Sequence, residues 1–553
     1  MKRNLMRSRF LAAIASLFLM VGVVTAASPA KADDLKFVCF PGMTLGQCTG
    51  DLGNGLGTYE VQLPDNFNGT LLLFFHGIRF GKNTPVLQSL KAAGIDYSGD
   101  PSYSSVTVPG LGPAWVANGR AELAPGGSLA LAKAMMAKGY GVAGLGYGST
   151  QSWAVQEAYA AGQAFVKMAR SGYVFGMKRI IVWSESMGTL PALKLAETTP
   201  GINGMYSTCA TPPSTEMAFS QALDALFVLK TLGGLDLKLT YSAGPAGLAE
   251  AYGDLNKVLG FLGAIRADAN NVAPTKLLSR NVVLLAGLIA GLPEASASYD
   301  GITTGGPLAA SQLNSSAAMA ENIGAAALLA TILRFDVESR IRMAGGIATG
   351  SANFTDNVNT SYTDLLSDEQ RAQYETFLNL GGTNVVDTML AALDASKGNE
   401  KARYAANPAA VAAAKATFPE YTGVAKVPTV LVGYEVDNVT QAGQVARYVD
   451  KTVAATKKGK APLAVGMYAA APSDGWTVLG DAAATAKKRT SGIGHCGGSS
   501  LLTGAQHLAL MPALETWVRK GAKAGTAAIS AVRLDSTLGF NPDPDWAPVP
   551  VKR

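Results

Sequence analysis

Three uninterrupted apolar runs that alternate with helical patterns constrain the fold of this chain more than any other feature. The runs cover residues 70–75, 140–147 and 179–183, and the helical patterns cover residues 129–138, 155–168 and 189–197. Apolar runs without alternation are typical of strands buried on both faces of a parallel sheet. Such strands are joined by right-handed crossovers through helices. We therefore predict an α/β fold with a mostly parallel sheet flanked by helices, to which residues 59–63 add a further strand.

The strand pattern stops at about residue 212 and resumes only at residues 427–433 and 463–469. The intervening segment contains helical stretches at residues 217–232, 245–262, 317–332, 368–378 and 405–417. A helical pattern at residues 506–520 closes the sheet part. The predicted organisation is a discontinuous sheet domain, residues 33–211 and 427–522, interrupted by a large helical cap, residues 212–426. We expect the Pro-rich residues 523–553 to form an extended tail.

The first 32 residues have the order of a secretory signal peptide. A basic start is followed by apolar residues 10–24 and by Ala30-Lys31-Ala32, an A-x-A cleavage pattern. The apolar stretch is short for a membrane span, so we expect cleavage after Ala32 rather than an anchor. Residues 281–293 are also too short to span and predict a buried helix. These features predict a bacterial protein that is exported to the periplasm or the medium.

The basic charge of the chain resides mostly in this leader. The formal charge is +6, and residues 1–32 carry five Lys and Arg and no acidic residue, which leaves +1 for the rest. A nearly neutral protein has no charge that selects nucleic acid or an anionic membrane as a partner. The chain is 48% hydrophobic and only 16% charged, which excludes a disordered protein.

The cysteine pattern predicts disulfides rather than a metal site. An even number of cysteines in an exported chain favours pairing. The four are Cys39, Cys48, Cys209 and Cys496. Cys39 and Cys48 close a short loop and are expected to pair, which leaves Cys209 and Cys496 as the second pair. Zinc is not expected, because the spacings do not fit and the chain has only three histidines, His76, His495 and His507.

A candidate nucleophile lies between the strand at residues 179–183 and the helix that follows. The sequence Ser184-Glu185-Ser186-Met187-Gly188 has small residues two positions before and two after a serine. In a G-x-S-x-G elbow, small residues at these positions allow the strand-to-helix turn to close. Ser186 would then be exposed at a helix N-terminus, where the helix dipole favours negative charge. The motif alone is weak, because Ser and Gly are common in this chain, but the strand and helix around it strengthen it.

A base and an acid for this serine lie late in the chain. His495 is in a glycine-rich loop before the closing helix, whereas His507 lies inside that helix and is expected to pack or to face solvent. An acid is needed to orient the base and to stabilise its charged form. Asp437, in the loop after residues 427–433, is the first candidate, and Glu435 is the alternative.

The order Ser186, Asp437, His495 resembles that of the α/β-hydrolase family of serine esterases, lipases and peptidases. The resemblance covers residues 59–209 and 427–520. It implies that the His76-Gly77 dipeptide ends an early strand and that the next loop supplies an oxyanion-hole amide. The matching positions are Gly77 and Ile78, and Met187 would supply the second amide.

The chain departs from that family in two places. Ser184 stands where the first glycine of the elbow is usual, and the helical segment is far longer than in a minimal member, as a lid or cap would be. The His495-Cys496 pair also resembles tannase and feruloyl-esterase relatives, in which this cysteine bonds one beside the nucleophile. Glu185 occupies that position here, so a Cys209–Cys496 disulfide would fix the histidine loop instead.

The resemblance implies an exported carboxylic-ester hydrolase that needs no cofactor or metal. The segment Ala222 to Leu229 is mostly apolar, which favours apolar, aromatic or polyester-type esters if these residues line the site, and says nothing of substrate if they form the cap's own core. An exported serine peptidase on the same fold is the alternative. A non-catalytic binding protein with this fold is the alternative of another class.

Overall fold

The computed structural model describes residues 38–79, 105–108, 112–115, 121–147, 153–269, 277–291, 323–372, 384–470, 495 and 504–552, apart from short gaps inside these ranges. The chain divides into two units, Met1–Val38 and Cys39–Arg553. All the helices and strands below belong to the second unit. The predicted signal peptide lies outside the described residues.

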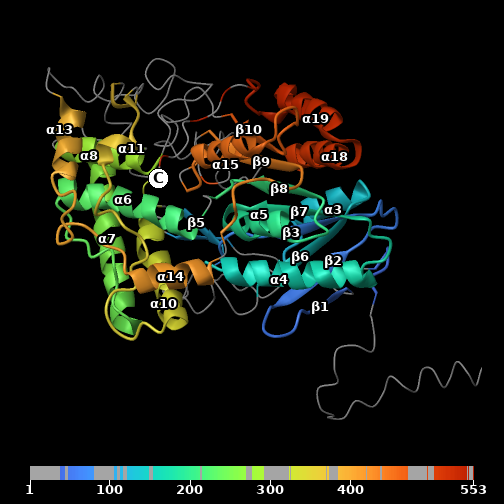
Figure 1. The fold of residues 1–553 in the computed structure, drawn as a ribbon, viewed down its shortest axis with the longest axis horizontal. Coiled ribbons are helices and arrows are strands. Elements are labelled where there is room, and N and C mark those ends of the chain that lie inside the picture. The colour runs from blue at the N-terminus through green and yellow to red at the C-terminus, as the bar shows by residue number, and fades with distance from the viewer. Residues whose placement is uncertain are drawn as a thin grey trace, which may run out of the picture. The chain divides into compact units, whose positions relative to one another are not determined.

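An eight-stranded sheet forms the centre of this unit, in the order β1-β2-β6-β3-β7-β8-β9-β10 (Figure 1). The strands are β1 Thr49–Asp51, β2 Thr58–Gln62, β3 Thr70–Phe75, β6 Gly141–Gly146, β7 Arg179–Glu185, β8 Gly204–Thr208, β9 Thr429–Tyr434 and β10 Ala464–Ala469. The strands from β6 to β10 in this order are parallel, and β1 and β2 are antiparallel at one edge. The predicted mostly parallel sheet is confirmed. A separate hairpin of β4 Ser105–Val108 and β5 Gly112–Trp115 was not predicted.

Helices cover both faces of the sheet, as predicted. They are α3 Leu129–Ala137, α4 Val155–Met168, α5 Thr189–Thr198, α15 Ala442–Ala455 and α18 Gly504–Lys520. Side chains of β3 alternate between two apolar clusters: Leu71, Leu73 and Phe75 pack with α4, α5 and α15, whereas Leu72 and Phe74 pack with α3 and α18. All five of these β3 side chains have 0% exposure, which explains the uninterrupted apolar run.

Between β8 and β9 the described residues form helices and no strand. The helices are α6 Thr215–Gly233, α7 Gly244–Ala269, α8 Leu277–Ile289, α10 Arg334–Gly345, α11 Tyr362–Leu365, α13 Val385–Asp394 and α14 Pro408–Thr417. Figure 1 shows them gathered to the left of the sheet. Their apolar side chains belong to the same cluster as those of α4 and α5, so the helical segment and the sheet pack together continuously. No helix among the described residues is both long and apolar enough to cross a bilayer.

Helix α6 has local signals at both ends. The Ser214 side chain accepts a hydrogen bond from the Met217 backbone as an N-cap, and Gly234 ends the helix at φ 68°. The whole stretch Ala222 to Leu229 is buried. These residues therefore form the core of the helical segment. Of the two interpretations given above, this is the one that carries no information about the substrate.

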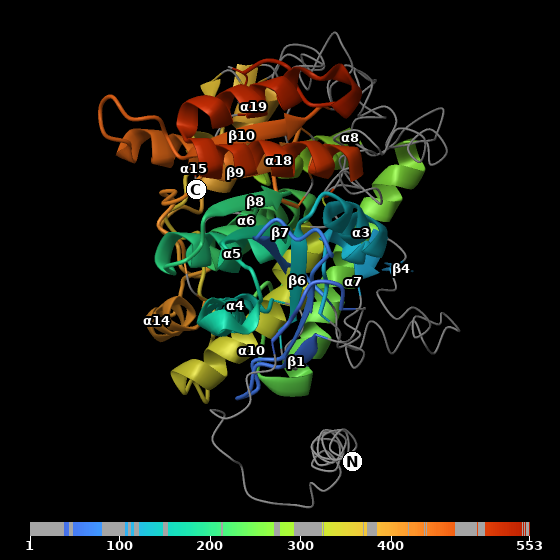
Figure 2. The ribbon, with the colours of Figure 1, turned by 90° about the vertical axis from the view of Figure 1, so that its right-hand side faces the viewer.

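The predicted extended tail is partly wrong, because residues Ala522–Leu534 form helix α19. Helices α18 and α19 lie side by side (Figure 2). A Cβ on Gly525 would approach Trp517 to 2.2 Å, so the absence of a side chain allows this contact, and Ile529 is also buried against the same cluster. The packing face mixes Ala522, Gly525 and Ala528 with Ile529 and Val532. A 3-10 turn at Ser536–Leu538 follows α19, and the chain then runs along β10: the Asn541 backbone amide donates to the Tyr468 carbonyl, and Phe540 forms a β-bridge with Ala469.

His507 lies inside α18 with 0% exposure. Its ring packs against Trp183 and Tyr206, with centroids 5.4 and 5.6 Å apart, and its Nδ1 is 2.8 Å from the Tyr206 hydroxyl. Burial lowers the pKa of His507 from 6.5 to about 3. Its role is to pack in the core in the neutral form.

This buried histidine predicts acid sensitivity. Below pH 6.5 the unfolded chain takes up a proton on His507 and the folded chain does not. The contribution of His507 to the free energy of unfolding is therefore complete above that pH and is lost as the pH falls towards 3. Between pH 6.5 and 5 the loss from this one group is about 2 kcal/mol. We expect urea titrations to show that the free energy of unfolding falls more between pH 7.5 and pH 5.0 for wild type than for His507→Gln. The glutamine retains a polar partner for Tyr206 and does not titrate. Equal pH dependence of the two proteins would contradict this.

Candidate active site

The strand-to-helix turn after β7 has the geometry of a nucleophile elbow. Ser186 has φ 51°, in the left-handed region that side chains rarely adopt, and α5 begins three residues later at Thr189. Such a residue is held only where the surrounding structure determines its conformation, and such strain is frequent at active sites. The predicted turn is therefore present, with Ser186 at its tip.

Two glycines allow this turn to lie against the end of β3. A Cβ on Gly188 would be 2.4 Å from the Phe75 carbonyl oxygen, and a Cβ on Gly77 would be 2.9 Å from the Cβ of Ser186. Ser184, which stands in place of the usual glycine, is buried and donates a hydrogen bond to Ser207 of β8 at 2.9 Å. A serine fits here because its hydroxyl has a partner inside the sheet.

The structure brings Ser186, His495 and Asp437 together in one hydrogen-bonded line. Ser186 Oγ lies 2.8 Å from His495 Nε2. His495 Nδ1 lies 3.1 Å from Asp437 Oδ1 and 3.3 Å from Oδ2. The His495 side chain is 31% exposed, whereas Asp437 and Ser186 are buried, so the base is the member of this line that is most accessible to solvent. The serine, the base and the first-choice acid predicted from the sequence thus occupy the relative positions that nucleophilic catalysis needs.

Asp437 is held as a carboxylate. Its Oδ1 accepts from the backbone amides of Val439 and Thr440, and its Oδ2 accepts from the Thr440 hydroxyl. Burial acts to raise the pKa of Asp437, but His495 and the amide hydrogen bonds outweigh it and lower the pKa. The alternative acid, Glu435, points elsewhere: its Oε1 accepts a hydrogen bond from Asn541 of the tail.

The predicted oxyanion-hole residues lie around the same serine. Met187 follows Ser186 directly and is fully buried, and Gly77 packs against the serine side chain. Ile78 follows in the same loop after β3. Their roles as amide donors remain predictions.

A buried charged cluster beside the serine was missed by the sequence analysis. Arg79 donates from Nη2 to Glu185 Oε1 at 2.7 Å, and from Nε and Nη2 to the two carboxylate oxygens of Glu122 at 2.7 and 2.6 Å. Burial alone would lower the pKa of Arg79, but the two glutamates raise it, whereas burial raises the pKa of Glu122 and the adjacent Arg79 acts to lower it. A signal was available, since an arginine that follows a buried strand by four residues and Gly77 by two needs a partner if it is buried.

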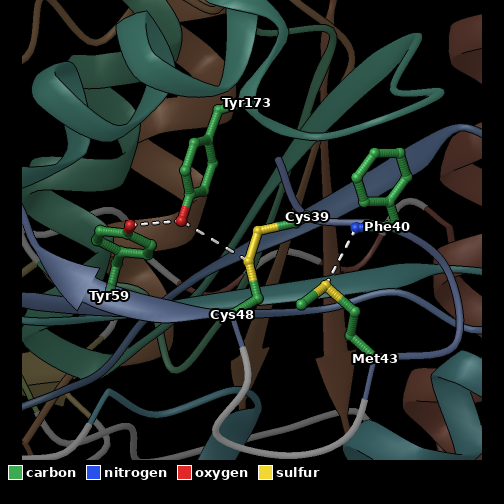
Figure 3. The surroundings of a disulfide bond; sticks show 6 residues. All are labelled: Cys39, Phe40, Met43, Cys48, Tyr59 and Tyr173. Carbon is green, nitrogen blue, oxygen red and sulfur yellow. Dashed lines mark hydrogen bonds between the residues drawn. A yellow bond between two sulfur atoms is a disulfide. The ribbon is translucent and has the colours of Figure 1, made fainter. Parts of the chain in front are cut away.

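One predicted disulfide is confirmed and lies at the β1–β2 end of the sheet. Cys39 and Cys48 are bonded, and the Cys48 sulfur also contacts the Tyr173 hydroxyl at 3.8 Å (Figure 3). That hydroxyl is 2.5 Å from the Tyr59 hydroxyl. The disulfide closes the loop from Cys39 to Cys48, and non-covalent contacts with Tyr173 and Val174 hold this loop against the segment between α4 and β7.

Cys209 is also disulfide-bonded, and it lies directly after β8. Because Thr208 pairs in register with Glu185, Cys209 and Ser186 follow the ends of neighbouring strands. Its predicted partner, Cys496, lies outside the described residues. Within the described residues no group of three or more His, Cys, Asp or Glu is arranged to hold a metal ion.

No family model matches the chain, and no curated protein matches it. Among solved structures the chain is similar to feruloyl esterase B from Aspergillus oryzae, at 12% identity and a TM-score of 0.30, covering 84% of this chain and 78% of that chain. It is also similar to tannin acyl hydrolase from Aspergillus niger, at 12% identity and a TM-score of 0.29, covering 84% of this chain and 76% of that chain. A likeness this distant carries no argument about activity, and the α/β fold rests on the sheet itself.

The close packing of the elbow predicts that Gly188→Ala loses both stability and reactivity of Ser186. The added methyl group has no room beside the Phe75 carbonyl, so the turn has to shift at a cost of about 1–3 kcal/mol and displace Ser186. Gly260→Ala is the matched control, because Gly260 is an exposed residue of α7 with nothing within 4 Å of its added Cβ. Alanine there should stabilise the protein by about 0.5–1 kcal/mol. Thermal unfolding and active-site labelling check both variants, and an unaffected Gly188→Ala would contradict the packing argument.

The position of Cys209 predicts that mass mapping of non-reduced peptides recovers a Cys209–Cys496 pair as well as Cys39–Cys48. The reason is that Cys209 lies beside the strand end that carries Ser186, and His495 adjoins Cys496 in the sequence. A Cys496 thiol that reacts with iodoacetamide in the unreduced, unfolded protein would exclude this pairing.

Proposed function

We propose that this protein is an exported serine hydrolase that cleaves carboxylic esters through an acyl-enzyme. The observation that carries the proposal is the line of hydrogen bonds from Ser186 through His495 to Asp437. A serine hydroxyl is a weak nucleophile unless a positioned base takes its proton, and a base in this line has a buried carboxylate that orients it.

In the first half-reaction His495 Nε2 takes the proton of Ser186 as Oγ bonds to the ester carbonyl carbon. The electron pair of the carbonyl moves to its oxygen, which the amides of Met187 and of Gly77 or Ile78 would stabilise. Loss of one such donor typically costs about 2.7–4 kcal/mol of transition-state stabilisation. The tetrahedral species then collapses, the bond to the alcohol oxygen breaks, and that oxygen takes the proton from His495 Nε2.

In the second half-reaction water repeats these steps on the acyl-enzyme. His495 takes a proton from water as its oxygen attacks the acyl carbon. The bond to Ser186 Oγ breaks, Oγ regains the proton, and the carboxylic acid leaves. Asp437 stays ionised throughout and stabilises the imidazolium, in agreement with its lowered pKa.

One further feature supports the proposed export. The disulfide-bonded state of Cys39, Cys48 and Cys209 is typical of proteins outside the reducing cytoplasm. Apolar, aromatic or polyester-type acyl groups remain the proposed substrate class. The buried stretch from Ala222 to Leu229 adds nothing to that preference, because it packs inside the helical segment.

We expect a fluorophosphonate probe to label the folded wild-type protein at Ser186, because the probe reports a serine activated by its base. Ser186→Ala should lose labelling and reduce ester turnover by at least about 10³-fold, the order typical for loss of a triad member. A panel of p-nitrophenyl esters of varied acyl length and aromaticity measures the turnover.

Aminoacyl anilides run in parallel separate an esterase from a peptidase. Cleavage of anilides at rates comparable to the esters would favour the peptidase. Folded wild-type protein that neither reacts with the probe nor cleaves esters would exclude the proposed chemistry and favour a binding protein.

A further inference from the structure

The loop that follows β3 has three successive backbone carbonyls, each held by a side chain. The Tyr147 hydroxyl donates to the His76 carbonyl at 3.2 Å. His76 Nδ1 lies 2.7 Å from the Gly77 carbonyl, and Arg79 Nη1 donates to the Ile78 carbonyl at 2.9 Å. Because a carbonyl only accepts, His76 must carry its proton on Nδ1, and burial lowers the pKa of His76 so that the ring stays neutral.

The first two of these bonds determine where the Gly77 and Ile78 amides point, and the third fixes the peptide plane that follows Ile78. The peptide bonds here are trans, so each C=O points away from the N–H of the next residue in the same plane. Fixing the His76 carbonyl aims the Gly77 amide, and fixing the Gly77 carbonyl aims the Ile78 amide. Those are the two amides of this loop predicted to face the oxyanion. The Ile78 carbonyl is held by Arg79, which closes the series.

The guanidinium of Arg79 links this loop to the nucleophile strand. It bonds Glu185, the residue directly before Ser186, and both oxygens of Glu122 in the loop before α3. Glu185 Oε2 accepts in turn from the Gly126 amide at 3.0 Å. The side chains of Arg79, Glu122 and Glu185 are 4%, 5% and 5% exposed, so water does not compete for these bonds. The planar fork of an arginine can hold several acceptors in one fixed geometry, which a lysine cannot.

We propose that Arg79, clamped by Glu185 and Glu122, is a positioning residue that sets the oxyanion-hole loop against the Ser186 nucleophile. This inference rests on the proposed ester hydrolysis. Glu185 thereby has a role of its own, since it transmits the position of the β7 end to the loop after β3. Arg79 does not touch the reacting atoms: it holds the Ile78 carbonyl, and with it the peptide that follows Ile78, so that the loop carrying the Gly77 and Ile78 amides keeps its position against Ser186. Oxyanion stabilisation depends on donors already aimed at the developing charge, and a displacement of about 1 Å can cost about 10²-fold in rate.

The test compares Arg79→Gln and Glu185→Gln with wild type in ester kinetics. We expect kcat to fall about 10–100-fold with KM changed less than about threefold, because the donors matter in the transition state and not in ground-state binding. The affinity for a trifluoromethyl ketone, which forms a tetrahedral oxyanion adduct with the serine, should fall in the same proportion. Arg79→Lys should be intermediate, and a lysine variant as active as wild type would overturn the role of the fork geometry.

Glu515→Gln is the matched control. Glu515 is a buried carboxylate of α18 that accepts hydrogen bonds from the Thr70 and Tyr140 hydroxyls. It lies at the opposite end of β3 from Gly77, so its loss should lower the melting temperature while kcat and ketone affinity stay near wild type. If Arg79→Gln and Glu185→Gln lower kcat no more than Glu515→Gln at a comparable melting temperature, the positioning role is wrong.

The failure of this inference is distinguishable from that of ester hydrolysis. The proposed function fails if wild type neither labels at Ser186 nor turns over esters. The positioning role fails if wild type does both and the variants keep wild-type kcat and ketone affinity. If circular dichroism shows that Arg79→Gln does not fold, the milder Glu185→Gln tests the positioning role alone. This variant keeps an oxygen that can accept from the Gly126 amide.

Discussion

The close approach of the elbow after β7 to the end of β3 is the constraint on which the rest of this site depends. Gly188 lies against the Phe75 carbonyl and Gly77 against the Ser186 side chain, at separations that leave no room for a further carbon atom. This contact forces Ser186 into a left-handed conformation and presents its hydroxyl above the sheet. The proposed oxyanion amides lie beside the nucleophile because the backbone after β3 lies against the backbone of the elbow.

Charged residues below the surface maintain that contact at a cost. An arginine and two glutamates are buried together beside the serine, and a buried charge is tolerated only when it is paired and hydrogen-bonded. An apolar cluster of the same volume would pack without this penalty but would leave the Ile78 carbonyl without the Arg79 donor. The cluster is therefore better explained by the alignment of backbone groups than by stability.

The sheet and the serine could be predicted because their signals are local. Uninterrupted apolar runs indicate strands buried on both faces, and the small residues around Ser186 indicate a tight turn. Asp437 and Glu435 could not be separated with certainty, because both follow the same strand and only the three-dimensional path shows which one meets His495. Arg79 and Glu122 are 43 positions apart, and no short-range pattern connects them. Helix α19 was missed although Ile529 and Val532 lie on its packing face, because the prediction rested on the prolines that follow the helix.

The path of the C-terminal tail has a consequence for how copies of this chain can associate. Strand β10 is the last strand of the sheet, and its outer side is met by Phe540 and Asn541, while Trp546 packs on Tyr468. The opposite margin ends in β1, which has only three residues. Short or covered margins deprive another chain of a template for strand addition. Neither margin of this eight-stranded sheet therefore offers a long open strand among the described residues, and a chain shortened before Phe540 would regain an open β10 margin.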